Sequence, residues 1–133
     1  MQTVYLDTSA AMKLVIEEAE SDALVDELAS DGDRRLVSSW LLHADMHCAA
    51  GRHPREVDPD AVRSVLDTVS LVDLTRGDLL AAGTRALLRS NDAIHLAVAL
   101  RIGSDEIVTY DGELSARAQS AGLAVRSPGT GTD

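Results

Sequence analysis

Short apolar runs alternate with longer segments of helical spacing along most of this chain. Five runs are expected to form strands, at residues 2–6, 35–38, 70–74, 106–109 and 123–126, the last at an edge. Seven helices are expected, at residues 9–16, 20–30, 40–50, 59–68, 78–89, 92–102 and 113–121. Strands separated by helices favour a mostly parallel sheet with helices on both faces. The sequence therefore predicts an α/β fold, a three-layer αβα sandwich with a mostly parallel central sheet.

The length of 133 residues fits one domain with a real hydrophobic core. Phe is absent, and Trp and Tyr contribute only three residues, so Leu, Val, Ile and Ala must build this core. The domain is expected to span residues 1–126. Residues 127–133 are rich in Gly, Thr and Pro, and are expected to form a disordered tail.

Three features of the sequence bear on the compartment. No apolar run approaches the length of a bilayer span, and no basic region precedes the first hydrophobic residues, so neither a membrane span nor a signal peptide is expected. The single cysteine, Cys48, excludes an internal disulfide. These features fit a cytoplasmic protein, with Cys48 interpreted as a small buried residue on a helix.

The formal net charge of −10 argues against a protein that binds nucleic acid broadly through a basic surface. A nuclease stays possible, because metal ions neutralise part of the charge in a nuclease site.

Four aspartates stand where strands and helices are expected to meet: Asp7, Asp45, Asp92 and Asp111. In an open parallel sheet the crevice lies beyond the carboxyl ends of the strands, and this topology allows all four carboxylates to reach it. Aspartate disfavours strands and resists burial, and converging carboxylates repel one another without a cation. The pattern therefore predicts a divalent-metal site.

The histidines suggest no second metal site. His43 and His47 are four residues apart, but Asp45 lies nearly opposite both on a helix, so the pair is expected at the surface or against a partner. His95 is interpreted as a histidine at the edge of the core that makes one hydrogen bond.

Four segments in order resemble the PIN domain, and specifically the VapC-like toxins of bacterial toxin–antitoxin pairs. They are VYLDTSA at 4–10, SSWLLHAD at 38–45, NDAIHLA at 91–97 and VTYDGEL at 108–114. The resemblance implies a small endoribonuclease toxin that uses Mg²⁺ or Mn²⁺ to hydrolyse RNA. It also implies inhibition by a cognate VapB-like antitoxin bound across the catalytic groove, and a homodimer.

By position, the resemblance assigns Asp7, Asp92 and Asp111 to the metal site. Asp45 stands where the family usually has glutamate. The shorter side chain of aspartate withdraws the carboxylate by roughly 1.5 Å. It can still hold a metal through a water, since magnesium usually keeps several.

Four further side chains are expected to surround the carboxylates. Thr8, Ser9 and Thr109 are candidates for hydrogen bonds that orient them. Asn91 is a candidate for a water or phosphate contact, with a helix cap as the equal alternative.

The apolar residues of segment 12–16 and of the following helix, including Leu24 and Leu28, are ordinary core by spacing alone. The resemblance suggests that part of this surface contacts the antitoxin.

Two other functions are compatible with the sequence. One is a binding module of the same fold, with a metal site weakened at Asp45. The other is a receiver-like phosphoacceptor domain, which would need an acidic pair after the first strand and a lysine on a late strand. The chain has only Asp7 and Lys13 to offer, which disfavours the receiver-like domain.

Overall fold

The computed structural model describes residues 1–30 and 32–130. Asp31, in the turn that follows the second predicted helix, and residues 131–133, at the end of the predicted tail, lie outside the described residues.

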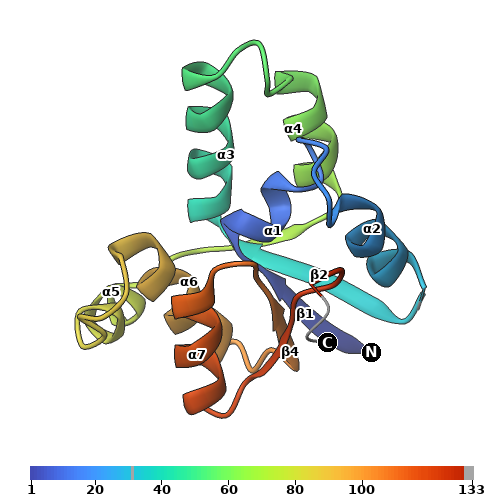
Figure 1. The fold of residues 1–133 in the computed structure, drawn as a ribbon. Helices are drawn as coiled ribbons and strands as arrows, with labels where there is room; N and C mark the ends of the chain where they lie inside the picture. The colour runs from blue at the N-terminus through green and yellow to red at the C-terminus, as the bar shows by residue number, and fades with distance from the viewer. Residues whose placement is uncertain (31, 131–133) are drawn as a thin grey trace.

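Strands and helices alternate through most of the chain, as the sequence predicts (Figure 1). The strands are β1 (Gln2–Leu6), β2 (Arg34–Ser39), β3 (Ser70–Val72), β4 (Glu106–Val108) and β5 (Ala124–Arg126). The helices are α1 (Thr8–Met12), α2 (Ser21–Ala29), α3 (Trp40–Arg52), α4 (Pro59–Asp67), α5 (Arg76–Ala82), α6 (Ser90–Arg101) and α7 (Gly112–Ser120).

The five strands form one sheet in the order β3-β2-β1-β4-β5, and every pairing is parallel. The prediction of a mostly parallel sheet is confirmed, and β5 lies at an edge as expected. The strand order reverses between β1 and β4, which is the point where open parallel sheets form their ligand crevice.

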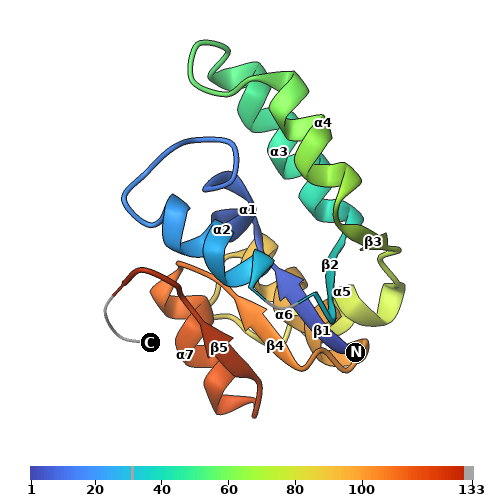
Figure 2. The same ribbon diagram turned by 90° about the vertical axis from the view of Figure 1, so that its right-hand side faces the viewer.

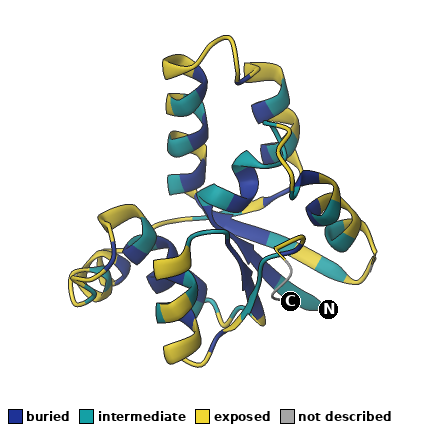
Figure 3. Cartoon of the chain, viewed as in Figure 1, coloured by how far each residue is buried: buried dark blue, intermediate teal, exposed yellow. Residues whose placement is uncertain are grey.

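Helices cover both faces of the sheet, so the three-layer prediction is also confirmed (Figures 1 and 2). On one face Val4 and Leu6 of β1 join a core with α1 to α4, and on the other Tyr5 joins a core with α6 and α7. Figure 3 shows the central strands β1 and β4 as largely buried, whereas part of β2 is exposed. Helices α3 and α4 project together beyond the sheet, and α3 carries Asp45 (Figure 1).

The helix predicted at 9–16 is wrong in length, because α1 ends at Met12. The hydroxyl of Ser21 donates to the backbone carbonyl of Lys13 at 2.8 Å and also contacts that of Ile16 at 3.2 Å. These two carbonyls lie in the last turn of the predicted helix and would have no partner within it; the hydroxyl from α2 satisfies them where the chain turns.

The helix predicted at 78–89 is displaced towards the N-terminus, because α5 runs from Arg76 to Ala82. Thr75 and Asp78 form a reciprocal capping box, which sets the start of α5. Gly83 caps the other end.

Part of the predicted tail is built into the molecule. Pro128 is buried, and its carbonyl accepts a hydrogen bond from the Tyr110 hydroxyl at 2.7 Å. Ser127 donates to the carbonyl of Thr109 at 2.6 Å. Within the described residues, no helix has the length and apolar character that crossing a membrane requires.

Candidate functional site

The pairing of β1 with β4 builds the centre of the site. Leu6 pairs with Val108, so the next residues, Asp7 and Thr109, leave the sheet side by side. The Thr109 hydroxyl donates to Asp7 Oδ2 at 2.6 Å. The strand register, which no local sequence signal reports, thus joins residues 102 positions apart.

Asp7 is only 1% exposed and has a structural role that the sequence did not reveal. It caps α1, since its Oδ1 accepts from the Ala10 N–H at 2.9 Å, and it also accepts from the Ser9 hydroxyl at 2.8 Å. Burial raises the pKa of the Asp7 carboxyl, and these hydrogen bonds only partly oppose that effect.

Asp45, on α3, is held from two sides. Thr8 donates to its Oδ2 at 2.7 Å, and the Asn91 amide of α6 donates to its Oδ1 at 2.8 Å. Partial burial favours the neutral form of Asp45. The interactions with His95, Thr8 and Arg52 outweigh that effect and lower its pKa, so it stays ionised at neutral pH.

Asp92 lies in the first turn of α6, half-buried, and its carboxylate makes no side-chain hydrogen bond in the described part of the chain. Burial raises its pKa, and the nearby carboxylates of Asp111 and Asp7 raise it further. Asp111 caps α7 by accepting from the Leu114 N–H at 2.8 Å. The effect of Asp111 and Asp7 on the pKa of Asp92 fits a fold that brings the three carboxylates near one another.

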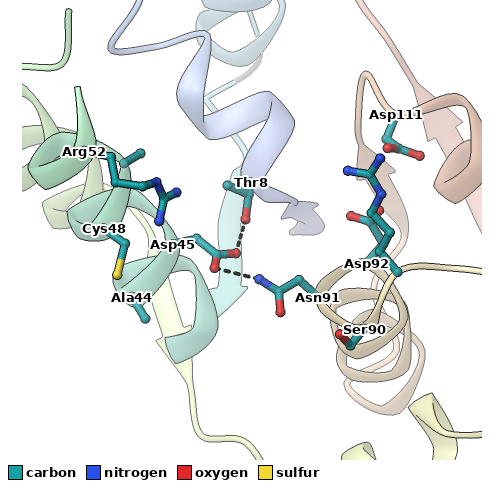
Figure 4. A pocket seen from close by; sticks show the side chains of 11 residues that line it. Thr8, Ala44, Asp45, Cys48, Arg52, Ser90, Asn91, Asp92 and Asp111 are labelled. Carbon is teal, nitrogen blue, oxygen red and sulfur yellow. Dashed lines mark hydrogen bonds between the residues drawn. The ribbon is translucent and has the colours of Figure 1, made fainter.

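A cleft of about 620 Å³ opens over these groups. Asp45, Asp92 and Asp111 line it, whereas Asp7 lies behind it. Figure 4 shows Asp45, linked to Thr8 and Asn91, facing Asp92 and Asp111 across the opening. Two exposed arginines, Arg52 and Arg89, also line the cleft.

The chemistry of these donors fits a hard divalent cation, because carboxylate oxygens are the ligands that Mg²⁺ and Mn²⁺ prefer. The pKa of Asp92 is raised first by burial and then by the carboxylates of Asp111 and Asp7, and a cation would favour its ionised form. In this arrangement no three His, Cys, Asp or Glu side chains among residues 1–30 and 32–130 are placed so as to share one ion.

The four further side chains that were predicted to surround the carboxylates also lie beside them. Ser9 and Thr109 contact Asp7, and Thr8 and Asn91 contact Asp45. The helix-cap alternative for Asn91 is wrong, because Arg89 occupies the N-cap of α6. The functional roles of all eight residues stay predictions.

Two interpretations from the sequence are wrong. Cys48 is exposed and lines the cleft, because α3 projects from the sheet and leaves this face uncovered. His95 is fully buried and makes two hydrogen bonds rather than one, to Tyr5 at 2.7 Å and Thr8 at 2.9 Å. The spacing of Asn91 and His95, one helical turn apart on α6, was the available signal that both face Asp45 and Thr8.

His43 and His47 contact each other on α3, with ring centroids 4.4 Å apart. His43 is exposed and His47 is half-buried, and neither lines the cleft.

The fold and the site define a family. The model of the PIN domain matches residues 4–119, and the chain belongs to the PIN domain family. The receiver-like interpretation is wrong, since receiver sheets have the strand order 2-1-3-4-5 rather than the order found here.

Within this family the resemblance to VapC toxins is confirmed. The chain is 38% identical over 135 residues to "Ribonuclease VapC35" of Mycobacterium tuberculosis, covering 95% of this chain and 97% of that protein.

Two solved structures show the same fold. One is Mycobacterium tuberculosis VapC20, described as a sarcin-ricin loop cleaving toxin, with a TM-score of 0.69 and 17% identity over 86% of this chain and 94% of that one. The other is a toxin–antitoxin complex from Klebsiella pneumoniae, with a TM-score of 0.67 and 17% identity over 94% of this chain and 97% of that one.

Proposed function

We propose that the protein is a metal-dependent endoribonuclease toxin that hydrolyses RNA phosphodiester bonds and is inhibited by a cognate VapB-like antitoxin. The observation that carries this proposal is the acidic cleft at the β1/β4 reversal, in a chain similar along its whole length to a protein named as a ribonuclease. In this proposal Asp7, Asp45, Asp92 and Asp111 hold Mg²⁺ or Mn²⁺.

The bound cation supplies positive charge that lowers the pKa of a water and stabilises the charge that develops on the phosphate. The side chains prepare the place for it. Thr8 and Asn91 fix Asp45, while Ser9 and Thr109 fix Asp7. The carboxylate of Asp92 makes no side-chain hydrogen bond in the described chain, so it is the one able to turn towards an arriving ion.

Arg52 and Arg89 offer a means to hold RNA on a protein of net charge −10. Both are exposed on the cleft, and guanidinium groups bind phosphate oxygens in a bidentate way. Their positive charge is thus concentrated beside the carboxylates, where an RNA backbone must approach.

The antitoxin is the proposed protein partner, because a solved neighbour of this fold is a toxin–antitoxin complex. Leu24 belongs to the core, but Leu14, Val15 and Ile16 after α1 are only partly buried and fit the apolar side of such an interface. A homodimer and a cytoplasmic location are further parts of the proposal.

The central test uses purified protein in metal-free buffer. The wild type should bind Mn²⁺ in calorimetry and cleave RNA when Mg²⁺ or Mn²⁺ is added, and EDTA should stop the cleavage. Asp92→Asn should weaken both binding and cleavage at least tenfold, since it removes one ligand charge. The matched control is Asp67→Asn, which changes an exposed aspartate at the end of α4, away from the cleft, and should leave both unchanged.

If the wild-type protein neither binds Mn²⁺ nor cleaves RNA, this proposal is refuted. The alternative, a binding module with a metal site weakened at Asp45, would then be favoured. Inhibition is tested separately, by adding the candidate antitoxin to the cleavage assay. The candidate is a small DNA-binding protein encoded by a neighbouring gene. Unchanged cleavage in the presence of a stable complex would refute inhibition across the groove.

A further inference from the structure

A chain of hydrogen bonds runs through the buried base of the site and ends on Asp45. It begins at Tyr5 on β1, whose hydroxyl lies 2.7 Å from His95 Nδ1. On the other side of the same ring, His95 Nε2 lies 2.9 Å from Thr8 Oγ1. Thr8 Oγ1 lies 2.7 Å from Asp45 Oδ2. Four secondary-structure elements, β1, α6, α1 and α3, each contribute one member.

The direction of this chain follows from counting protons. An ionised carboxylate only accepts, so the single hydroxyl hydrogen of Thr8 is donated to Asp45. Thr8 Oγ1 must then accept from His95, which places a hydrogen on Nε2. The remaining ring nitrogen, Nδ1, is left to accept from the Tyr5 hydroxyl. A tyrosine hydroxyl has an ordinary pKa of about 10, so at neutral pH Tyr5 carries the proton that it donates.

We propose that Tyr5, His95 and Thr8 form a directed hydrogen-bond chain that positions the Asp45 carboxylate for cation binding, with the imidazole of His95 held as the Nε2–H tautomer. His95 and Tyr5 are positioning residues, since neither lines the cleft. Tyr5 acts through His95, and His95 acts through Thr8 and through its own approach to Asp45, with Nε2 3.8 Å from Oδ2. The part of this proposal that concerns the cation rests on the proposed function, whereas the tautomer does not.

The burial of the chain explains why it can hold Asp45 in one orientation. Tyr5 and His95 are both 0% exposed, so solvent does not compete for their hydrogen bonds. Their rings also pack edge to face, with centroids 5.6 Å apart. Asn91 takes the second oxygen of Asp45 from the opposite side, so the carboxylate cannot rotate without losing a partner.

The first experiment reads the tautomer directly. Long-range ¹H–¹⁵N NMR spectra of uniformly labelled, metal-free protein report which ring nitrogen of each of the four histidines carries hydrogen. The signals of His95 are those missing from the His95→Gln spectrum. We expect hydrogen on Nε2 and none on Nδ1. Hydrogen on Nδ1, alone or together with Nε2, would overturn the directed chain.

The second experiment breaks the last link and restores it. Thr8→Val keeps the shape of the side chain but removes the hydroxyl, and should weaken Mn²⁺ binding in calorimetry by roughly 10–100-fold. Thr8→Ser restores the hydroxyl and should recover most of that loss. Mn²⁺ binding by Thr8→Val within twofold of the wild type would refute the positioning role.

The third experiment tests the far end of the chain. Tyr5→Phe removes the donor to Nδ1, so the Nδ1 resonance should shift and Mn²⁺ binding should weaken by a smaller factor than in Thr8→Val. Tyr110→Phe is the matched control, because it removes the only other tyrosine hydroxyl, which contacts the carbonyl of Pro128 instead. Equal Mn²⁺ affinity in Tyr5→Phe and Tyr110→Phe would remove Tyr5 from the chain.

These outcomes are separable from failure of the proposed function. If the wild type binds Mn²⁺ but cleaves no RNA, the nuclease assignment fails while the NMR and calorimetric results keep their meaning.

Discussion

Substitution of Asp7 separates its chemistry from its structural role. Asp7→Asn keeps an oxygen that can accept from the Ala10 N–H, and asparagine caps a helix about as well as aspartate does. It also removes a carboxylate whose pKa burial raises, a charge that is costly to keep in the folded state. The amide nitrogen that replaces Oδ2 cannot accept from the Thr109 hydroxyl, a loss of about 1 kcal/mol. The two effects oppose each other, so metal-free Asp7→Asn should unfold close to the melting temperature of the wild type.

Asp7→Ala provides the contrast. It removes the cap, at about 1 kcal/mol, and leaves the hydroxyls of Ser9 and Thr109 without their acceptor, at about 1 kcal/mol each. An unfolding entropy of roughly 2.1 cal/mol/K per residue over 133 residues makes each kcal/mol worth roughly 4 °C. The total of about 3 kcal/mol predicts a fall in melting temperature of roughly 10 °C.

Metal then separates the wild type from Asp7→Asn. At a Mn²⁺ concentration of 100 times the dissociation constant, the wild type gains about 2.7 kcal/mol, again roughly 10 °C. Asp7→Asn should gain much less, and should cleave RNA at least roughly 100-fold more slowly. The assay is thermal unfolding with and without MnCl₂, beside RNA cleavage. An equal Mn²⁺ shift in both proteins, with full cleavage by Asp7→Asn, would refute the assignment of Asp7.

Four further outcomes are expected. Because the pKa of Asp92 is raised, the folded state binds more protons than the unfolded state between the ordinary pKa of about 3.9 and the raised one. This group therefore stabilises the metal-free protein as the pH falls from neutral through that range. Asp92→Asn should flatten that part of the profile of melting temperature against pH. Asp78→Ala breaks the capping box of α5 and the ion pair with Arg101, so the melting temperature should fall by roughly 8 °C, for a loss of about 2 kcal/mol, while cleavage per folded molecule at low temperature stays unchanged. Cys48 should react with one equivalent of a thiol reagent in the native protein, and a reaction seen only after unfolding would contradict its exposure. Asp45→Glu should retain cleavage within tenfold, and a larger loss with intact folding would show that the shorter side chain is specifically required.

The sequence was a good guide to the strands and a poorer one to the helix ends. Apolar runs mark strands that are buried on both faces, which is why β1 and β4 were found nearly to the residue. The end of α1 depends on a hydroxyl from Ser21, nine residues beyond Met12, and no local pattern reports such a contact. The start of α5 was present in the sequence, as a threonine followed three residues later by an aspartate, and was missed.

The positions of Asp7, Asp92 and Asp111 could be predicted because each lies at or next to the start of a helix near the end of a strand. Asp45 lies inside α3, and the resemblance to the family indicated it. The direction in which the fold shifts the pKa of each carboxyl group could not be predicted. Asp45 and Asp92 have the same side chain and line the same cleft, yet the pKa of one is lowered and that of the other is raised. The difference comes from the neighbours of each carboxyl group. Burial raises the pKa of Asp45, but His95, Thr8 and Arg52 outweigh that effect. For Asp92, burial and the carboxylates of Asp111 and Asp7 outweigh the opposite effect of His95 and Arg89.

This asymmetry gives the two sides of the cleft different parts in the proposed binding of a cation. Asp45 is already ionised, doubly hydrogen-bonded and fixed, so it resembles a prepared ligand whose orientation costs little at the moment of binding. Asp92 is short of compensation, and a divalent ion would supply the positive charge that the protein leaves out. A site in which every carboxylate is compensated by groups of the protein would bind metal weakly. A site in which none is compensated would be destabilised by repulsion between its carboxylates. One fixed carboxylate facing one uncompensated carboxylate avoids both outcomes, which is why the hydrogen bonds to Asp45 matter as much as the charge of Asp92.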